Sequence, residues 1–156
     1  MEQQFLTYIA AHQGLLYKVC RSYGPDRDAQ RDLYQEIVLQ LWHAFPRFDG
    51  RVRWSTWAYR IALNVAITQR RRRRVLTLEL SERPDTAMPD SAGAHESLEV
   101  LYRAIAQLND AEKALILLHL DDLPYSEIAE ITGLTENHVG VKLSRIKSKL
   151  KTLIRT

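Results

Sequence analysis

Residues 124–154 read PYSEIAEITGLTENHVGVKLSRIKSKLKTLI, a pattern that predicts two helices separated by a tight turn. A helix-turn-helix needs a small residue where the helices cross, a residue that tolerates left-handed backbone at the turn, and an apolar anchor on the second helix. Ala129, Gly133 and Val139 occupy these three positions. Thr135 can cap the second helix, because its hydroxyl can accept a hydrogen bond from an otherwise unpaired backbone amide.

The second predicted helix separates apolar from polar residues. Its apolar stripe follows helical spacing and consists of Val139, Leu143, Ile146, Leu150 and Leu153. With about 3.6 residues per turn, the opposite face carries Asn137, Val141, Ser144 and Ser148, flanked by Gly140, Arg145 and Lys147. If this helix enters the major groove of DNA, Asn137 and Ser144 can hydrogen-bond base edges and Val141 can touch a thymine methyl group. Arg145 and Lys147 can then hold phosphates.

Positive charge is concentrated in two segments, although the net charge is only +3. Residues 51–75 carry eight basic side chains and no acidic one, no acidic residue follows Glu136, and residues 76–100 carry six acidic side chains and one basic. Clustered cations on separate segments are typical of proteins that bind polyanions. The alternative at the C-terminal end is a helical hairpin with a solvated basic face, but the turn pattern and the acid-free helix together favour DNA binding. The predicted duplex-binding residues are Thr135, Glu136, Asn137, Gly140, Val141, Ser144, Arg145 and Lys147.

The chain as a whole predicts an all-α fold of two small helical domains joined by a flexible linker. It is 46% hydrophobic, glycine and proline are few, and no alternating apolar run indicates a strand. We expect a first domain over residues 1–75, an acidic linker over 76–94, and a second domain over 95–156. In the second domain, Asn109 and Glu112 predict a capping box at the start of a helix.

Two helices are expected before the basic segment of the first domain. The first runs from Phe5 to Cys20, where apolar residues recur at helical spacing. The second begins after Asp26 or Asp28, either of which can cap it, and ends near Pro46. The single cysteine excludes an internal disulfide, and its apolar neighbours indicate a buried thiol.

A third helix is expected from about Trp57, with Ser55 or Thr56 as its cap, into the five arginines at 70–74. One side of it carries Arg60, Asn64, Thr68 and Arg71, and the preceding loop supplies Phe48, Arg51, Arg53 and Trp54. Aromatic rings interleaved with cations suit unstacked bases, because rings stack on bases while arginines hold the backbone.

The alternative for these aromatic residues is a place in the core. We interpret Trp42 and Tyr59 as core residues, whereas the loop position of Trp54 leaves both exposure and burial open. The arginine run also has the simpler interpretation of a solvated helix end.

Other functional classes find little support in the sequence. No segment has the roughly 18 apolar residues that span a bilayer, and the N-terminal residues lack the pattern of a secretory signal, so we expect a cytoplasmic protein. His119, Asp121 and Asp122 lie at a predicted helix end, where acidic residues are usually solvated or capping, so no metal site is predicted. Motifs for phosphate-binding loops or catalytic nucleophiles are missing, and we predict no cofactor and no enzymatic activity.

Two segments resemble a known family. Residues 26–74, DRDAQRDLYQEIVLQLWHAFPRFDGRVRWSTWAYRIALNVAITQRRRRR, closely resemble region 2 of the extracytoplasmic-function sigma factors, and residues 124–150 resemble their region 4. The pairing of D-L-x-Q-E with S-T-W-x-Y-R-I-A-x-N is the specific signal, because helix-turn-helix motifs occur in many regulators. The resemblance implies a non-catalytic subunit that binds core RNA polymerase and directs transcription initiation at stress- or signal-responsive genes.

The resemblance also implies roles for individual residues. Asp32, Gln35, Glu36 and Gln40 bind the clamp helices of the largest polymerase subunit; the simpler interpretation is a solvated helix face. The loop from Phe48 to Ser55, including Asp49 and Gly50, captures a flipped base of the −10 element, and the helix around Asn64 contacts neighbouring positions. The second domain contacts the −35 duplex and the polymerase beta flap, the acidic linker enters the polymerase cleft, and an anti-sigma protein masks both domains.

The chain departs from the family at two places, and a rival interpretation exists. Gly140 and Val141 stand where many relatives have a basic residue followed by serine, which weakens a forecast of direct −35 readout. Thr68 stands where relatives often carry Asp or Asn. The main rival is a helix-turn-helix regulator that binds duplex DNA without polymerase, and a third possibility is an enzyme acting on nucleic acid.

Overall fold

The computed structural model describes residues 1–80 and 96–155, with side chains for residues 1–72 and 97–155. Every regular element in these ranges is a helix, which confirms the predicted all-α class. The chain divides into two compact units, Met1–Met88 and Pro89–Thr156, and each is described by itself. Most of the segment predicted as an acidic linker, residues 81–94, lies outside the described residues.

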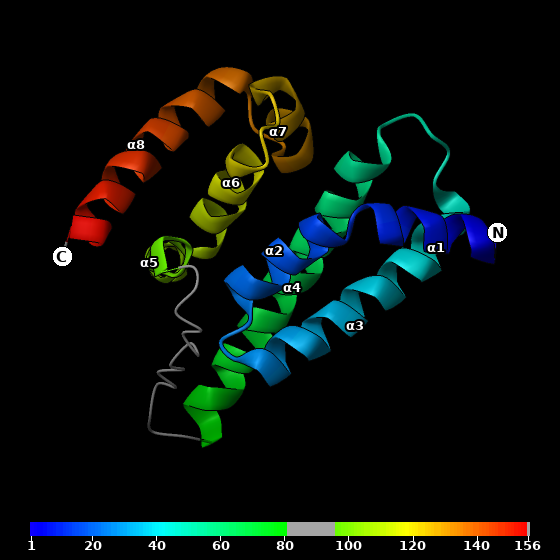
Figure 1. Cartoon of the computed structure of the whole chain (residues 1–156), viewed down its shortest axis with the longest axis horizontal. Helices are drawn as coiled ribbons and strands as arrows, with labels where there is room; N and C mark the ends of the chain where they lie inside the picture. Colours follow the sequence, from blue (N-terminus) through cyan, green and yellow to red (C-terminus); the bar gives the residue numbers. More distant parts are fainter. Residues whose placement is uncertain (81–95, 156) are drawn as a thin grey trace. The chain divides into compact units, whose positions relative to one another are not determined.

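Residues 1–80 of the first unit form four α-helices and one short 3-10 helix (Figure 1). They are α1 (Glu2–Ala11), α2 (Gln13–Tyr23), α3 (Arg27–Ala44), η1 (Phe45–Arg47) and α4 (Trp54–Leu80). Helices α2, α3 and α4 pack against one another. Their shared core includes the fully buried side chains of Leu16, Leu33, Ile37, Leu41 and Tyr59. Burial of one such side chain contributes about 1.5–3 kcal/mol, so this three-helix contact supplies much of the unit's stability.

The first predicted helix is interrupted at His12, which separates α1 from α2. The His12 ring lies with its centroid 4.8 Å from that of Trp54, and the Tyr8 ring stacks on the same indole at 5.2 Å. His12 Nδ1 also donates a hydrogen bond to the Tyr8 carbonyl oxygen at 2.9 Å. Packing against an indole from α4 accounts for the break, which helical periodicity within residues 5–20 could not reveal.

The structure defines the start of α3 and both ends of α4 more closely than the sequence predicted them. Asp26, not Asp28, caps α3, because its side chain accepts a hydrogen bond from the Ala29 amide at 2.8 Å. Helix α4 begins at Trp54, three residues earlier than expected, so the proposed caps Ser55 and Thr56 lie inside the helix. It continues to Leu80, past residue 75, where the first domain was predicted to end.

The described part of the second unit, residues 96–155, forms four helices: α5 (Glu96–Ala106), α6 (Asp110–Leu120), α7 (Tyr125–Thr132) and α8 (Glu136–Arg155). Each of α5, α6 and α7 packs against α8. The core contains the fully buried side chains of Ile105, Leu117, Leu118, Ile128 and Leu143. The predicted capping box of α6 is present, with Asn109 accepting from the Glu112 amide at 2.8 Å and Glu112 accepting from the Asn109 amide at 3.0 Å.

Candidate nucleic-acid interface

The turn between α7 and α8 has the geometry expected of a helix-turn-helix. Gly133 adopts the left-handed conformation with φ +82° and ψ 6°, which a residue with a Cβ adopts only at a cost. Thr135 caps α8 through its hydroxyl, which accepts a hydrogen bond from the His138 amide at 3.1 Å. Val139 is completely buried and anchors the start of α8. The predicted roles of Gly133, Val139 and Thr135 are therefore confirmed, whereas the predicted close crossing at Ala129 stays a prediction.

Helix α8 buries one face and exposes the other, as its spacing predicts. The buried face consists of Val139, Leu143, Ile146 and Leu150, with Leu153 half-buried at the end. Seven of the predicted duplex-binding residues are exposed or half-buried on α8: Glu136, Asn137, Gly140, Val141, Ser144, Arg145 and Lys147. Val141 is the unusual member of this face, because it is an apolar residue that is 42% exposed between polar neighbours.

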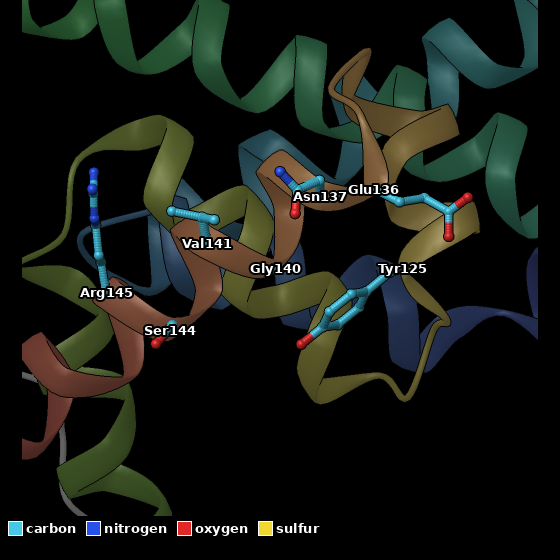
Figure 2. A pocket seen from close by; sticks show the side chains of 7 residues that line it. All are labelled: Tyr125, Glu136, Asn137, Gly140, Val141, Ser144 and Arg145. Carbon is cyan, nitrogen blue, oxygen red and sulfur yellow. The ribbon is translucent and has the colours of Figure 1, made fainter.

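Six of these residues and one unexpected residue line a shallow groove of about 600 Å³ (Figure 2). The lining consists of Tyr125, Glu136, Asn137, Gly140, Val141, Ser144 and Arg145. Tyr125 is the first residue of α7 and was absent from the predicted set. The signal that could have pointed to it is Gly140, since a glycine inside a helix often marks the close approach of a neighbouring group.

The positive charge of α8 is partly engaged inside the second unit. Lys149 Nζ lies 3.2 Å from Glu112 Oε1 and so joins α8 to α6. Burial alone raises the pKa of Glu112, but hydrogen bonds from the Asn109 amide and from Lys149, with the charges of Lys149 and Lys142, lower that pKa overall. Arg145, in contrast, is exposed and lines the groove, and Lys147 is exposed on α8 beside it. They are the cations best placed to meet phosphates.

In the first unit, the loop between η1 and α4 forms the second candidate surface. Gly50 has φ +79°, and Arg51 pairs with Asp49 at 3.1 Å while its amide donates to the same carboxylate at 3.0 Å. These contacts give the exposed residues 49–51 a defined turn. Phe48 is half-buried with its ring centroid 5.0 Å from that of Trp57, and Arg53 is exposed.

Trp54 is buried, which settles the alternative that the sequence left open. Only 6% of its surface is exposed. Its indole lies against the rings of Tyr8, His12 and Trp57, with centroids 4.8–5.9 Å away. A ring covered on these sides cannot stack on a base, so the predicted direct contact of Trp54 with DNA does not fit this geometry. The residue instead fixes the start of α4 beneath the loop.

Of the two aromatic residues interpreted as core, one is buried and the other is partly exposed. Tyr59 is completely buried, as predicted. Trp42 was interpreted as core but is 37% exposed, although its indole lies with its centroid 5.0 Å from that of Phe5 of α1.

Helix α4 carries its predicted polar row on an exposed side. Arg60, Asn64, Thr68 and Arg71 are all exposed. Asn64 and Thr68 also line a groove of about 410 Å³ with Glu36 and Gln40 of α3. Two sets of residues that the sequence assigned to different partners, DNA and polymerase, are thus neighbours in the first unit.

The predicted polymerase-binding residues lie along α3 beside an apolar surface. Asp32, Gln35 and Gln40 are exposed and Glu36 is half-buried. Gln35 borders a groove of about 530 Å³ that is otherwise mostly apolar. Leu39, Trp42 and Leu6, which line it, are 45%, 37% and 51% exposed. The sequence predicted only the polar residues of this surface, because Leu39 falls off the buried stripe of α3.

The described residues contain neither a metal-binding cluster nor a reactive thiol. Across residues 1–80 and 96–155, His, Cys, Asp and Glu form no group of three or more that could hold a metal, the segment around His119 included. The Cys20 thiol is buried, and desolvation raises its pKa to about 12, so it stays protonated. Each helix in these ranges is too short or too polar to cross a bilayer.

Comparisons with known proteins identify both units. A family model for sigma-70 region 2 matches residues 8–75, and a model for sigma-70 region 4 matches residues 98–150. The chain is 31% identical to the ECF RNA polymerase sigma factor SigG of Mycobacterium tuberculosis over 89% of its own length, and spans 45% of that protein. It is 25% identical to SigW of Bacillus subtilis and 27% identical to the sigma-E factor of Escherichia coli, and in both cases covers 90% of the relative.

Solved structures show the same fold. The sigma factor RpoE of Bartonella quintana, crystallised with the anti-sigma factor NepR, matches with a TM-score of 0.82 and 18% identity, over 99% of this chain and 98% of that one. CnrH, solved with the cytosolic domain of CnrY, matches with a TM-score of 0.71 and 24% identity, over 99% and 90%.

Proposed function

The chain belongs to the sigma-70 family as an extracytoplasmic-function sigma factor, and we propose on that basis that it brings core RNA polymerase to promoters and helps to open them. The observation that carries the proposal is the presence, in one chain, of a region 2 unit and a helix-turn-helix unit, each with a cationic polar surface. In this proposal the chain is a non-catalytic, cytoplasmic subunit and needs no cofactor.

The second unit contacts the −35 element as duplex DNA. Helix α8 enters the major groove, where Asn137 and Ser144 hydrogen-bond base edges while Arg145 and Lys147 hold phosphates. The exposure of these four side chains on α8 and the left-handed turn at Gly133 support this role. The duplex-binding set predicted from the sequence is retained, with Tyr125 added to it.

The first unit holds the separated strand of the −10 element. The exposed loop residues 49–53 and the α4 residues Arg60, Asn64, Thr68 and Arg71 contact the unpaired bases and their backbone. Flipping a base out of the duplex costs a few kcal/mol, which contacts in the loop and binding to polymerase together offset. Trp54 acts here as a positioning residue, because its buried indole packs on Tyr8 and Trp57, whose rings lie against Phe48 of the loop.

Polymerase binds the exposed side of α3. Asp32, Gln35, Glu36 and Gln40 contact the clamp helices of its largest subunit, and the apolar residues Leu39 and Trp42 bury surface beside them. The second unit binds the beta flap, and the acidic segment at 76–94 enters the polymerase cleft. Because these surfaces are exposed in the free chain, an anti-sigma protein that covers both units can hold it inactive. The partners in the two solved structures, NepR and the cytosolic domain of CnrY, support this regulation.

Transcription in vitro tests the proposal most directly. Core polymerase, genomic fragments and the chain should give run-off transcripts that core polymerase alone does not give, and the chain should co-elute with the core enzyme. Gln35→Ala should weaken co-elution, whereas the matched change Gln107→Ala, at an exposed residue of the second unit, should not. Tight duplex binding without co-elution or new transcripts would instead favour a regulator that acts without polymerase.

The anti-sigma partner has its own test in cells. Purification of the tagged chain from unstressed cells should recover an inhibitory protein, and its removal should raise transcription from the dependent promoters. Constitutive activity with no inhibitory partner recovered would contradict this part of the proposal.

A further inference from the structure

Gly140 lies inside α8, although glycine in a helix interior costs about 1 kcal/mol relative to alanine. Its backbone is helical, so no unusual dihedral angle requires glycine there. A Cβ atom at this position would lie 3.3 Å from Cε2 and 3.8 Å from Cδ2 of Tyr125. The missing side chain therefore makes room for the Tyr125 ring, which rests against the α8 backbone (Figure 2).

Two partly exposed residues with large apolar surface line a depression in a polar surface. Tyr125 is 39% exposed and Val141 is 42% exposed, and both line the groove that Gly140 floors. The remaining residues of the groove, Glu136, Asn137, Ser144 and Arg145, are polar or charged. We name the depression formed by Tyr125, Gly140 and Val141 the methyl notch.

The chemistry of the major groove identifies what fits this notch. Base edges in that groove present hydrogen-bond donors and acceptors, and the C5-methyl group of thymine is their one apolar feature. We propose that the methyl notch receives the C5-methyl group of a thymine in the upstream promoter duplex and so selects a T·A base pair at that position. The inference rests on the proposed function, since it needs α8 in the major groove.

The positions of the polar neighbours support this placement. Asn137 precedes the notch by one helical turn and Ser144 follows it by one turn, so hydrogen-bond contacts flank the apolar one on the same face. Arg145 is exposed beside them and can hold the phosphate backbone that fixes the register.

The test removes one methyl group from the DNA at a time. Duplexes that bind the full chain, alone and with core polymerase, are enriched from a randomised library. Each thymine of the enriched upstream element is then replaced by deoxyuridine, which lacks only the C5-methyl group. At one position this change should weaken binding of the unmodified chain about fourfold, as expected for one buried methyl group.

Variants of the chain test whether the notch causes this loss of binding. Gly140→Ala places a Cβ 3.3 Å from the Tyr125 ring, so the ring must shift and the added methyl group takes up space in the notch, whereas Tyr125→Ala removes the ring. Each variant should therefore bring the ratio of the affinities for the thymine and deoxyuridine duplexes closer to one. Tyr125→Phe should keep the ratio, because the ring and not the hydroxyl carries the contact. Gly14→Ala is the matched control, since within the described residues a Cβ at Gly14 meets no atom within 4 Å. It should leave the ratio unchanged.

Several results would overturn the inference. They are an enriched element without thymine, a ratio of one at every thymine, and a ratio that survives both Gly140→Ala and Tyr125→Ala. Loss of binding in Tyr125→Phe without any effect of deoxyuridine would assign Tyr125 to a phosphate contact instead. Transcription from the enriched promoters separates this outcome from failure of the proposed function. If transcripts form and the thymine-to-deoxyuridine ratio is one, only the notch is rejected. If no transcripts form, the sigma activity is rejected, and the binding measurement on duplexes still tests the notch.

Discussion

The two candidate DNA surfaces are positioned in different ways. In the second unit the binding side chains project from the single helix α8, so their spacing in the sequence sets their spacing on the surface. In the first unit the loop at residues 48–53 packs through Phe48 on rings from η1 and α4, which flank the loop, and on Tyr8 of α1, which is distant in the sequence. The helix surface therefore depends on local periodicity, whereas the loop surface depends on contacts between distant elements.

The largest expected effect concerns the aromatic support of the loop. Trp54→Ala should lower the free energy of unfolding of the first unit by about 3–5 kcal/mol, because it removes a buried indole and leaves a cavity among Tyr8, His12 and Trp57. Urea unfolding followed by tryptophan fluorescence measures this unit selectively, since all three tryptophans of the chain lie in it. Trp54→Phe, which keeps an aromatic ring, should recover part of the loss. A loss below about 1 kcal/mol for the alanine variant would mean that the loop does not depend on this indole.

The second effect separates the exposed tryptophan from the buried one. Trp42→Ala should weaken binding to core polymerase about thirtyfold, since exposed aromatic residues at the centre of an interface commonly contribute about 2 kcal/mol or more. Sedimentation or fluorescence titration with core polymerase measures the affinity. Tyr17→Ala is the control, because Tyr17 is also an exposed aromatic residue, at 54%, but lies outside the predicted surface. Equal losses in both variants would show that Trp42 has no special place in binding.

The outcomes of the sequence predictions follow the same division between local and distant contacts. The buried stripe of α8, the turn at Gly133 and the capping box at Asn109 follow from residues within one or two helical turns of each other. The exposure of Trp42 and the break at His12 depend on rings contributed by other helices.

Tyr125 shows the same limit inside the candidate site. It reaches the α8 surface from a neighbouring helix and contacts a residue fifteen positions away in the chain. Helical spacing along α8 could not include it. Only the unexplained glycine at 140 pointed to a neighbour, without saying which residue it was.

A third prediction compares two glycines, one in each unit. Gly133→Ala should destabilise the second unit by about 1–2 kcal/mol, because an L side chain is strained at φ +82°. Gly14→Ala should stabilise the first unit by up to about 1 kcal/mol, since Gly14 lies in α2 with space for a Cβ among the described residues. Amide hydrogen exchange in α8 and in α2 reports the two units separately. Effects of the same sign would contradict the conformational difference between the two positions.

The smallest effect concerns the ion pair that joins α6 to α8. Glu112→Gln should lower the stability of the second unit by less than about 1 kcal/mol near neutral pH, because the pair with Lys149 is only partly buried. Glutamine keeps an oxygen that can accept the Asn109 amide, so the substitution removes the charge and preserves the cap.

The pH dependence of this difference follows from the pKa of Glu112, which is lowered in the folded chain. A carboxylate with a lowered pKa contributes stability above its unfolded pKa of about 4.3, and that contribution is lost as the pH falls through the folded pKa. The difference between the two proteins should therefore be present at neutral pH and disappear in acid. NMR signals of α6 amides during urea unfolding measure it, with Lys149→Gln as the matched variant that removes the partner. A difference that persists in acid would assign the effect to the cap geometry, since the charge of Glu112 is absent there.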